Sequence, residues 1–244
     1  MVHVKIVGFD LDDCLFNSTK LSENARVKGL EAMIRLGLDI NKDEGIKLLQ
    51  EVVQEYGSNS SRHFDFFLRR LNELENISIP LSEQYQYIAA AVIAYHKEKI
   101  KSIKLYDDVE PSFKKLKEMN LKIAIISDGL PVKQYEKIIR LNLIHLVDHI
   151  IISDEIGVRK PNPRLFDYCL KKFNIKYDEM IYVGDNLEKD IIPAKMNNII
   201  SIYIHRGGKH DKNLSKINLN KELHPDYEIY NLEEIIPIVQ NLNN

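Results

Sequence analysis

Hydrophobic residues in this chain gather in short, uninterrupted runs that are rich in β-branched side chains and end at polar residues or glycine. Five runs of this kind predict strands buried on both faces, at residues 4–9, 122–126, 149–152, 180–183 and 199–204. Amphipathic stretches with helical spacing lie between them, at residues 109–119, 132–141, 163–173 and 187–196. The alternation of strand and helix predicts an α/β fold with a parallel, doubly wound sheet.

One long interval, from about residue 18 to residue 103, lacks strand-like runs and shows only helical periodicity. It predicts four helices, at residues 21–36, 44–56, 63–74 and 82–100. We expect them to pack as a small bundle inserted over the strand ends, where it would act as a lid. The predicted domains are therefore a core of residues 1–17 and 104–244 and a helical cap of residues 18–103.

Composition narrows the classes of protein that fit. A length of 244 residues with 44% hydrophobic content suits one core domain and a smaller one. The formal charge of −2 gives no electrostatic case for nucleic acid or a membrane surface as partner. No apolar run approaches the roughly 18 residues of a membrane span, and no signal peptide precedes the first strand, so we expect a cytoplasmic protein. The oligomeric state is left open by the pattern.

The loop after the first predicted strand holds the first candidate chemistry. Asp10 and Asp12 lie two residues apart there, so one carboxylate can serve as a nucleophile and the other as a proton shuttle. A solvated acidic turn is the alternative interpretation. If Asp10 attacks a phosphoryl group, a divalent cation shared with a second acidic residue would offset the charge.

Asp185 and Asp190 offer that second acid, directly after the strand at 180–183. Gly184 before them allows a close approach of the backbone. Helix capping by Asp185 is the alternative. Oxygen ligands without Cys or His spacing favour Mg²⁺ over zinc, so Asp10, Asp185 and Asp190 are the candidate metal residues in these two segments.

Two further segments supply groups for an anion. Ser127 ends the strand at 122–126, and its hydroxyl, with the turn at Asp128 and Gly129, can donate to phosphate oxygens. Capping of the helix that starts near Pro131 is the alternative role for Ser127. Lys160 lies in a loop between prolines and offers a fixed positive charge beside the carboxylates.

Together these residues resemble the haloacid dehalogenase superfamily over nearly the whole chain. Its four motifs occur here in order: Asp-x-Asp at 10–12, Ser127, Lys-Pro at 160–161 and Gly-Asp-x-x-x-x-Asp at 184–190. The resemblance implies a Rossmann-like core with an inserted helical cap, and Mg²⁺-dependent hydrolysis of a small phosphate ester through an aspartyl-phosphate.

The same resemblance implies a role for each motif residue. Asp10 is the nucleophile, and Asp12 protonates the leaving group and then activates water. Ser127 and Lys160 bind phosphate. Asp185 holds Mg²⁺ together with Asp10 and the backbone carbonyl of Asp12, and Asp190 supports that arrangement from outside. Cys14, where the family often has Thr or Val, is expected to pack as a small hydrophobic residue.

Other activities are alternatives to phosphate hydrolysis for this set of residues. A 2-haloacid dehalogenase also attacks with an aspartate, but it needs no metal and typically lacks an acid at the position of Asp12. A phosphomutase, a receiver-type signalling module with acidic, Ser/Thr and Lys residues at strand ends, and a non-catalytic binding protein are the remaining alternatives. The module would lack the long helical insertion, and the intact catalytic set argues against the binding protein.

Substrate selectivity is expected on the cap, whose closure would exclude water. The turn at 56–62 carries Asn59 and Arg62 as candidate substrate-binding residues, with an ordinary polar loop as the alternative. Cap length and this turn resemble the archaeal Mg²⁺-dependent phosphatases that act on glyceraldehyde 3-phosphate and other small sugar phosphates. Residues 205–210 follow the last long strand and predict a flexible loop at the rim of the site.

Overall fold

A computed structural model describes residues 3–75, 77–208, 210–211 and 224–244 of the protein. The chain divides into two compact units, one formed by Met1–Thr19 and Ile103–Asn244 and the other by Lys20–Ser102. Among the described residues, no helix has the length and apolar character needed to cross a bilayer. The two units are described separately.

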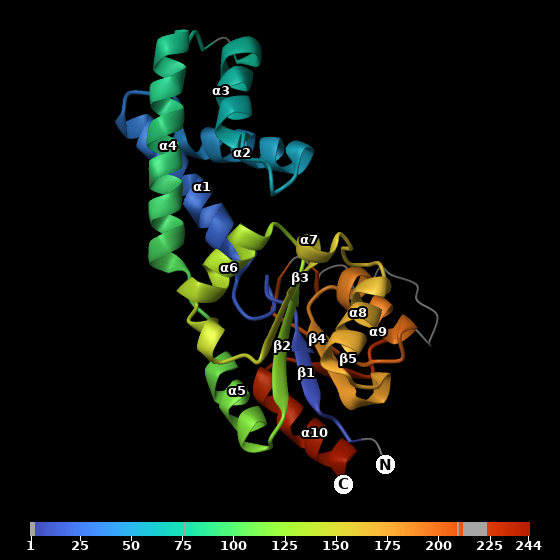
Figure 1. Cartoon of the computed structure of the whole chain (residues 1–244). Helices are drawn as coiled ribbons and strands as arrows, with labels where there is room; N and C mark the ends of the chain where they lie inside the picture. The colour runs from blue at the N-terminus through green and yellow to red at the C-terminus, as the bar shows by residue number, and fades with distance from the viewer. Residues whose placement is uncertain (1–2, 76, 209, 212–223) are drawn as a thin grey trace. The chain divides into compact units, whose positions relative to one another are not determined.

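The first unit is built on a six-stranded parallel sheet (Figure 1). Its strands are β1 (Ile6–Phe9), β2 (Lys122–Ser127), β3 (His149–Ile152), β4 (Met180–Gly184), β5 (Ile200–Ile204) and β6 (Tyr227–Ile229). They lie in the order β3-β2-β1-β4-β5-β6, and every neighbouring pair is parallel. The predicted α/β fold with a parallel sheet is confirmed.

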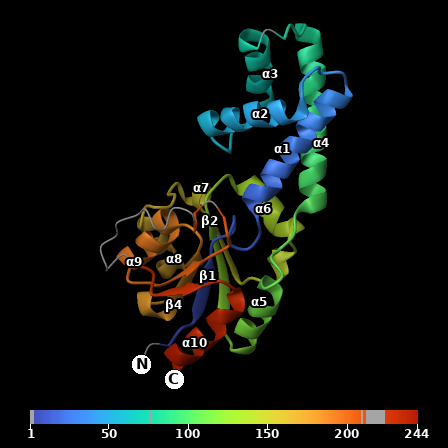
Figure 2. The same ribbon diagram turned by 180° about the vertical axis from the view of Figure 1, so that it is seen from behind.

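Helices cover both faces of this sheet. The regular ones are α5 (Val109–Glu118), α6 (Pro131–Arg140), α7 (Ser153–Ile156), α8 (Arg164–Phe173), α9 (Ile192–Met196) and α10 (Ile235–Asn243). Short 3₁₀ segments lie at Leu143–His145, Tyr177–Glu179 and Leu232–Glu234, and a π-helical segment, η3, at Leu187–Ile191. Figures 1 and 2 show α8 and α9 on one face and α5 and α10 on the other.

Ring contacts show how alternate strand residues serve the two faces. Phe9 of β1 packs against Phe113 of α5, with ring centroids 4.9 Å apart. Tyr182 of β4 packs edge to face on Phe166 of α8 at 4.7 Å. Because successive strand side chains point to opposite faces, strands covered on both sides need a continuous hydrophobic run, as the sequence has.

The strand order creates a crevice at the carboxyl ends of β1 and β4. The chain proceeds from β1 to β2 and β3 on one side, and then crosses to β4, β5 and β6 on the other. In doubly wound sheets, ligands bind where the winding direction switches. The loops after β1, β2 and β4, which carry three of the four motifs, therefore lie side by side.

The second unit is a bundle of four helices: α1 (Ser18–Arg35), α2 (Lys42–Tyr56), α3 (His63–Leu74) and α4 (Leu81–Ser102). Asn41 caps α2 through hydrogen bonds from the backbone amides of Asp43 and Glu44. The buried core of the bundle takes residues from all four helices, among them Leu30, Met33, Leu49, Val52, Phe67, Leu71 and Ala91. The four helices begin and end close to the predicted residues.

Candidate active site

Three aspartates form a buried acidic cluster at the switch point. Asp10 follows β1, Asp185 follows β4 and Asp190 lies in η3. One carboxylate oxygen from each lies within 4.8 Å of the others. The residues are only 7%, 6% and 1% exposed, respectively. Such burial of three acids requires compensating positive charge, protons or a cation.

Backbone geometry brings the three acids together. The amide of Asp10 donates to the carbonyl of Val183 at 2.9 Å, which ties the end of β1 to β4. Gly184 leaves room for the Asp190 side chain, because a Cβ there would lie 2.5 Å from Asp190 Cγ. The amide of Asn186 then donates to Asp190 Oδ2 at 3.0 Å. Close packing of backbone and carboxylate is thus why glycine stands at this position.

The capping alternative for Asp185 is wrong. Asn186 is the residue that caps η3, accepting a hydrogen bond from the amide of Lys189 at 3.0 Å. Asp185 precedes the capping residue, so its carboxylate does not cap the helix. The alternative role of Ser127 is wrong as well, because α6 begins at Pro131 after Leu130, without a side-chain cap.

Lys160 supplies the positive charge beside the cluster. Its ammonium nitrogen lies 2.5 Å from Asp10 Oδ1, 2.6 Å from Asp190 Oδ1 and 3.2 Å from the hydroxyl of Tyr182. The Tyr182 hydroxyl in turn donates to the carbonyl of Ile126 at 3.1 Å. Since an ammonium has three N–H donors, these three oxygens use all of them. A phosphate oxygen would have to replace one of these acceptors to bind Lys160.

Burial and like charges disturb the titration of the cluster. Burial raises the pKa of Asp10 to about 7, opposed by Lys160 and assisted by Asp190. Burial also raises the pKa of Asp185 to about 9, with the charges of Asp190 and Asp10 next in importance. For Lys160, burial acts to lower the pKa, but Asp10 and Asp190 outweigh it and the pKa lies well above its ordinary value. The lysine therefore stays charged.

The cluster has the composition of a site for a hard divalent cation. Its donors are carboxylate oxygens alone, as such cations prefer. When all are ionised, three carboxylates and one ammonium leave two unbalanced negative charges, the charge of one divalent cation. These residues can therefore hold a metal ion, and neutralising the cluster is what such an ion would do there.

Asp12 lies two residues from Asp10, and its carboxylate contacts α6. Lys137 Nζ lies 2.8 Å from Asp12 Oδ1 and 2.7 Å from Oδ2. Gln134 Nε2 donates to Asp12 Oδ2 at 3.1 Å. Sequence reasoning did not find Gln134 and Lys137. The available signal was a glutamine four residues before Ile138, where helical spacing predicts an apolar residue on the buried face.

The loop after β2 is organised by the same glutamine. Gln134 Nε2 donates to Ser127 Oγ at 2.8 Å and to the carbonyl of Asp128 at 2.6 Å. Accepting that bond leaves the hydroxyl hydrogen of Ser127 for another acceptor. The carboxylate of Asp128 accepts from the amide of Lys160 at 3.1 Å, and the amide of Gly129 donates to Ser153 Oγ at 3.1 Å. The motif residues Ser127 and Lys160 are thus linked through Asp128.

The expectation of a flexible loop after β5 is wrong for Arg206. Its guanidinium is buried and binds Asp108 with two hydrogen bonds, of 2.7 and 3.1 Å. Its Nε donates to the carbonyl of Cys14 at 2.9 Å, and it lies 4.2 Å from the ring centre of Tyr106. Arg206 therefore anchors the loop after β1, which carries Asp10 and Asp12, to the start of α5.

The neighbouring histidine is also held in place. His205 stacks on Tyr230 with ring centroids 4.4 Å apart, and its Nε2 lies 2.8 Å from Glu228 Oε2. Lys209 and residues 212–223 lie outside the described residues. Cys14 is fully buried, as expected for inert packing, and burial raises the pKa of its thiol well above the ordinary value.

Asn59 and Arg62 belong to the helical unit, where both are exposed. Arg62 lies 3.6 Å from Asp65 and over the ring of Phe66. Their turn is fixed from inside the bundle, because Arg26 donates to the carbonyl of Ser58 at 3.0 Å and His63 Nε2 lies 2.8 Å from the carbonyl of Gly57. The turn that carries the two predicted residues is therefore ordered within its own unit.

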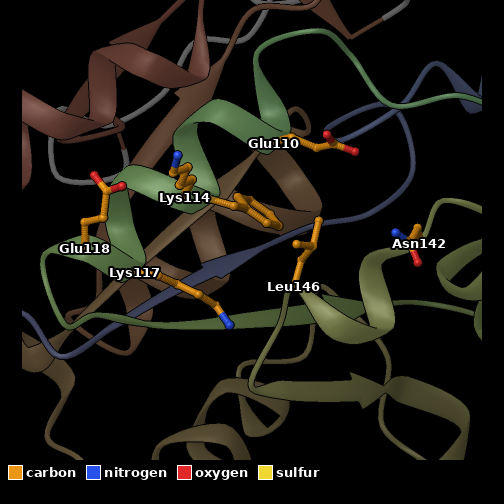
Figure 3. A pocket seen from close by; sticks show the side chains of 7 residues that line it. Glu110, Lys114, Lys117, Glu118, Asn142 and Leu146 are labelled. Atoms are coloured by element: carbon orange, nitrogen blue, oxygen red, sulfur yellow. The ribbon is translucent and has the colours of Figure 1, made fainter.

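A surface hollow of about 610 Å³ lies elsewhere on the first unit (Figure 3). It is lined by α5 and by residues around the 3₁₀ segment at Leu143–His145: Glu110, Phe113, Lys114, Lys117, Glu118, Asn142 and Leu146. None of these residues belongs to the four motifs. We therefore assign the chemistry to the acidic cluster and its neighbours.

Comparison with known proteins identifies the family of the chain. The family model of the haloacid dehalogenase-like hydrolases matches residues 4–197. A glyceraldehyde 3-phosphate phosphatase of Methanopyrus kandleri is 41% identical over 241 residues, 98% of both chains. One of Pyrococcus furiosus is 37% identical over 243 residues, 100% of this chain and 96% of that protein. The chain belongs to the haloacid dehalogenase-like hydrolase family.

Solved structures show the same fold. The crystal structure of a HAD phosphatase from Thermococcus onnurineus has a TM-score of 0.61 and 24% identity, and the match covers 97% of this chain and 98% of that one. A haloacid dehalogenase-like hydrolase from Xanthomonas campestris has a TM-score of 0.68 at 17% identity, with 100% and 97% covered. These structures confirm the predicted fold, and the family model with the relatives above confirms the predicted family resemblance.

Proposed function

We propose that this protein is a Mg²⁺-dependent phosphatase that hydrolyses a small phosphorylated metabolite through an aspartyl-phosphate on Asp10. The observation that carries the proposal is the buried cluster of Asp10, Asp185 and Asp190 against Lys160, with Asp12 two residues from Asp10. A nucleophilic carboxylate, fixed positive charge and a second carboxyl for protons are the groups that phosphoryl transfer to an aspartate requires.

Asp10 and Asp185 would hold Mg²⁺ through their carboxylates, with the backbone carbonyl of Asp12 as a further candidate ligand. Asp190, whose oxygens contact Lys160 and the amide of Asn186, would support this arrangement. When bound, the ion supplies positive charge that offsets the phosphoryl oxygens and orients them toward the nucleophile. The two unbalanced negative charges of the cluster support a divalent ion.

In the first step, a carboxylate oxygen of Asp10 attacks phosphorus and the bond between phosphorus and the ester oxygen breaks. The carboxyl of Asp12 gives its proton to the departing oxygen. The Ser127 hydroxyl donates a hydrogen bond to a phosphoryl oxygen, and Lys160 keeps positive charge beside Asp10 and the transferred group. Asp10 then carries the phosphoryl group as an acyl phosphate, and the alcohol is released.

In the second step, water attacks the phosphorus of the aspartyl-phosphate. Asp12, now a carboxylate, accepts the proton of this water, and the bond between phosphorus and Asp10 breaks. Inorganic phosphate leaves, Asp10 is a carboxylate again and Asp12 is protonated for the next cycle. One residue thus serves as acid and then as base, which requires that its carboxyl stay close to both oxygens in turn.

The helical unit Lys20–Ser102 would serve as a cap that selects the substrate and excludes water. The relatives named above support glyceraldehyde 3-phosphate or a similar small sugar phosphate, and such a substrate agrees with a cytoplasmic protein. Asn59 and Arg62 are the proposed cap contacts. Substituting either should raise KM for the true substrate far more than KM for p-nitrophenyl phosphate, and equal effects would remove them from the proposal.

A dehalogenase fits these residues less well. Expulsion of halide has no use for the second carboxyl of Asp12, which two side chains of α6 hold in place. A non-catalytic phosphate-binding protein fits less well still. Binding alone does not require a buried carboxyl such as Asp10, whose pKa is raised to about 7, beside a second carboxyl that can carry a proton.

Hydrolysis of glyceraldehyde 3-phosphate and p-nitrophenyl phosphate, by the native protein and by Asp10→Asn, tests the proposal. Each protein is assayed with Mg²⁺ and with EDTA. Release of phosphate that needs both Asp10 and Mg²⁺ supports the function. Release by Asp10→Asn at the native rate, or no release by the native protein from any small phosphate ester, contradicts it.

A further inference from the structure

The second carboxyl of the site is held by one helix outside the four motifs. Gln134 and Lys137 lie three residues apart on α6, and therefore on the same side of that helix. Together they contact both carboxylate oxygens of Asp12, at distances between 2.7 and 3.1 Å. The contacts join the loop after β1 to the helix that follows β2.

Gln134 has fewer hydrogens than acceptors. Its side chain is almost fully buried, at 2% exposure. The two N–H groups of its amide face three oxygens: Ser127 Oγ at 2.8 Å, the carbonyl of Asp128 at 2.6 Å and Asp12 Oδ2 at 3.1 Å. Asp12 has the longest of the three bonds. Gln134 therefore links Asp12 to the proposed phosphate-binding hydroxyl of Ser127. Its hydrogen bond to Asp12 is the weakest of the three and is the first to break when Asp12 moves.

Lys137 completes the support from the other side. Its ammonium group bonds both oxygens of Asp12 and lies 6.0 Å from the ring centre of Phe16. Phe16 is buried and forms a β-bridge with Asp12 across the tight loop after β1. Charged hydrogen bonds to both oxygens suit Asp12 as a carboxylate, the form that it has between giving up its first proton and accepting the proton of water. They limit rotation of this group more than one neutral contact does.

We propose that Gln134 and Lys137 are positioning residues that hold the carboxyl of Asp12 in the orientation needed for proton transfer to the leaving-group oxygen. This inference rests on the proposed function and adds two residues to it. Neither residue touches the transferred phosphoryl group in the proposed reaction, and both act through Asp12.

The positioning of Asp12 can be measured because phosphate esters differ in whether their leaving group needs a proton. An alkoxide, such as the leaving group of a sugar phosphate, is strongly basic and must be protonated as it departs. The p-nitrophenolate ion leaves without a proton. A misplaced general acid therefore slows the alkyl ester selectively, by up to the roughly 100- to 10,000-fold that general acid catalysis contributes. The parameter kcat/KM reports the step in which the leaving group departs.

The test compares Lys137→Met with Lys133→Met on the same two esters. Lys133 is an exposed residue of the same helix, so both variants lose one positive charge from α6. We expect Lys137→Met to lower kcat/KM for glyceraldehyde 3-phosphate at least about 10-fold more than for p-nitrophenyl phosphate. Lys133→Met should keep the native ratio of the two values, and Lys137→Arg should restore most of it.

Two results would overturn the inference. Equal losses on both esters would assign Lys137 to phosphate binding or to folding, and an unchanged ratio with full activity would leave Asp12 positioned without it. Gln134→Met provides a second variant. Because Gln134 also bonds Ser127 at 2.8 Å, it should lower kcat/KM for both esters, and lower it further for glyceraldehyde 3-phosphate than for p-nitrophenyl phosphate. A native protein that hydrolyses neither ester overturns the proposed function itself, whereas an active native protein with unaltered variants overturns only this inference.

Discussion

The contact between Gly184 and Asp190 gives the sharpest prediction, and Gly184→Ala is the perturbation. A Cβ at position 184 would lie 2.5 Å from Asp190 Cγ and 2.6 Å from Oδ2. These separations are far inside van der Waals contact, so the aspartate must leave its place. It then loses the 2.6 Å ion pair with Lys160 and the 3.0 Å hydrogen bond from Asn186.

The expected cost follows from what Asp190 leaves behind. Breaking a buried ion pair by displacing one partner costs about 3–5 kcal/mol, and Lys160 and Asp190 are both nearly fully buried. We therefore expect Gly184→Ala to lower the free energy of unfolding by about 3–5 kcal/mol. Affinity for Mg²⁺ should fall by about 10- to 100-fold, since an acid that orients the site is lost.

Urea unfolding of four proteins identifies the cause: native, Gly184→Ala, Asp190→Gly and the double variant. If the new methyl group acts by expelling Asp190, the double variant should be no more than about 1 kcal/mol less stable than Asp190→Gly. Additive losses, or a Gly184→Ala protein as stable as the native one, would refute the reasoning from this contact.

Three further predictions concern the charges and the loop around the site. The pKa of Asp10 is raised to about 7 and that of Asp185 to about 9, so the folded metal-free protein holds protons that the unfolded chain has released, and its stability should fall as pH rises from about 4 to 9. Added Mg²⁺ should accordingly raise Tm more near pH 8 than near pH 5, and an equal shift at both pH values would contradict a metal bound by these carboxylates. Arg206→Met leaves Asp108 buried without its bidentate partner, so it should lower the free energy of unfolding, measured in urea, by about 3–5 kcal/mol. A loss under about 1 kcal/mol would show that the ion pair between Arg206 and Asp108 is unimportant for stability. Cys14 is fully buried and the pKa of its thiol is raised, so iodoacetamide should not modify it in the folded protein. Mass spectrometry measures the modification, and a reaction as fast in the folded protein as in urea would contradict this expectation.

Strand runs and helical spacing were enough to predict the core fold, because strands covered on both faces must be continuously apolar. The stretch at 187–196 is the exception, since one predicted helix is divided into η3 and α9 (Ile192–Met196). Pro193 lies in the first turn of α9 and has no N–H to continue the preceding hydrogen bonds. Helical periodicity tolerates such a change of pitch and does not reveal it.

The candidate site was predictable where residues end strands and unpredictable where they depend on distant contacts. Asp10 and Asp185 follow neighbouring strands of a switch point, so sequence order and sheet rules bring them together. Gln134 contacts Asp12 across 122 positions of the chain. A glutamine on a buried helix face signals that some polar partner exists, but the partner is set by how α6 packs.

Transfer of the phosphoryl group to Asp10 is the central claim, and mass spectrometry of the reacting enzyme tests it directly. The native protein is mixed with glyceraldehyde 3-phosphate and Mg²⁺, quenched in acid during turnover and digested. We predict the added mass of a phosphoryl group on the peptide that contains Asp10, absent in Asp10→Asn and in EDTA. Rapid release of phosphate without a phosphorylated peptide at any quench time would contradict the account. A phosphoryl group on a residue other than Asp10 would contradict it as well.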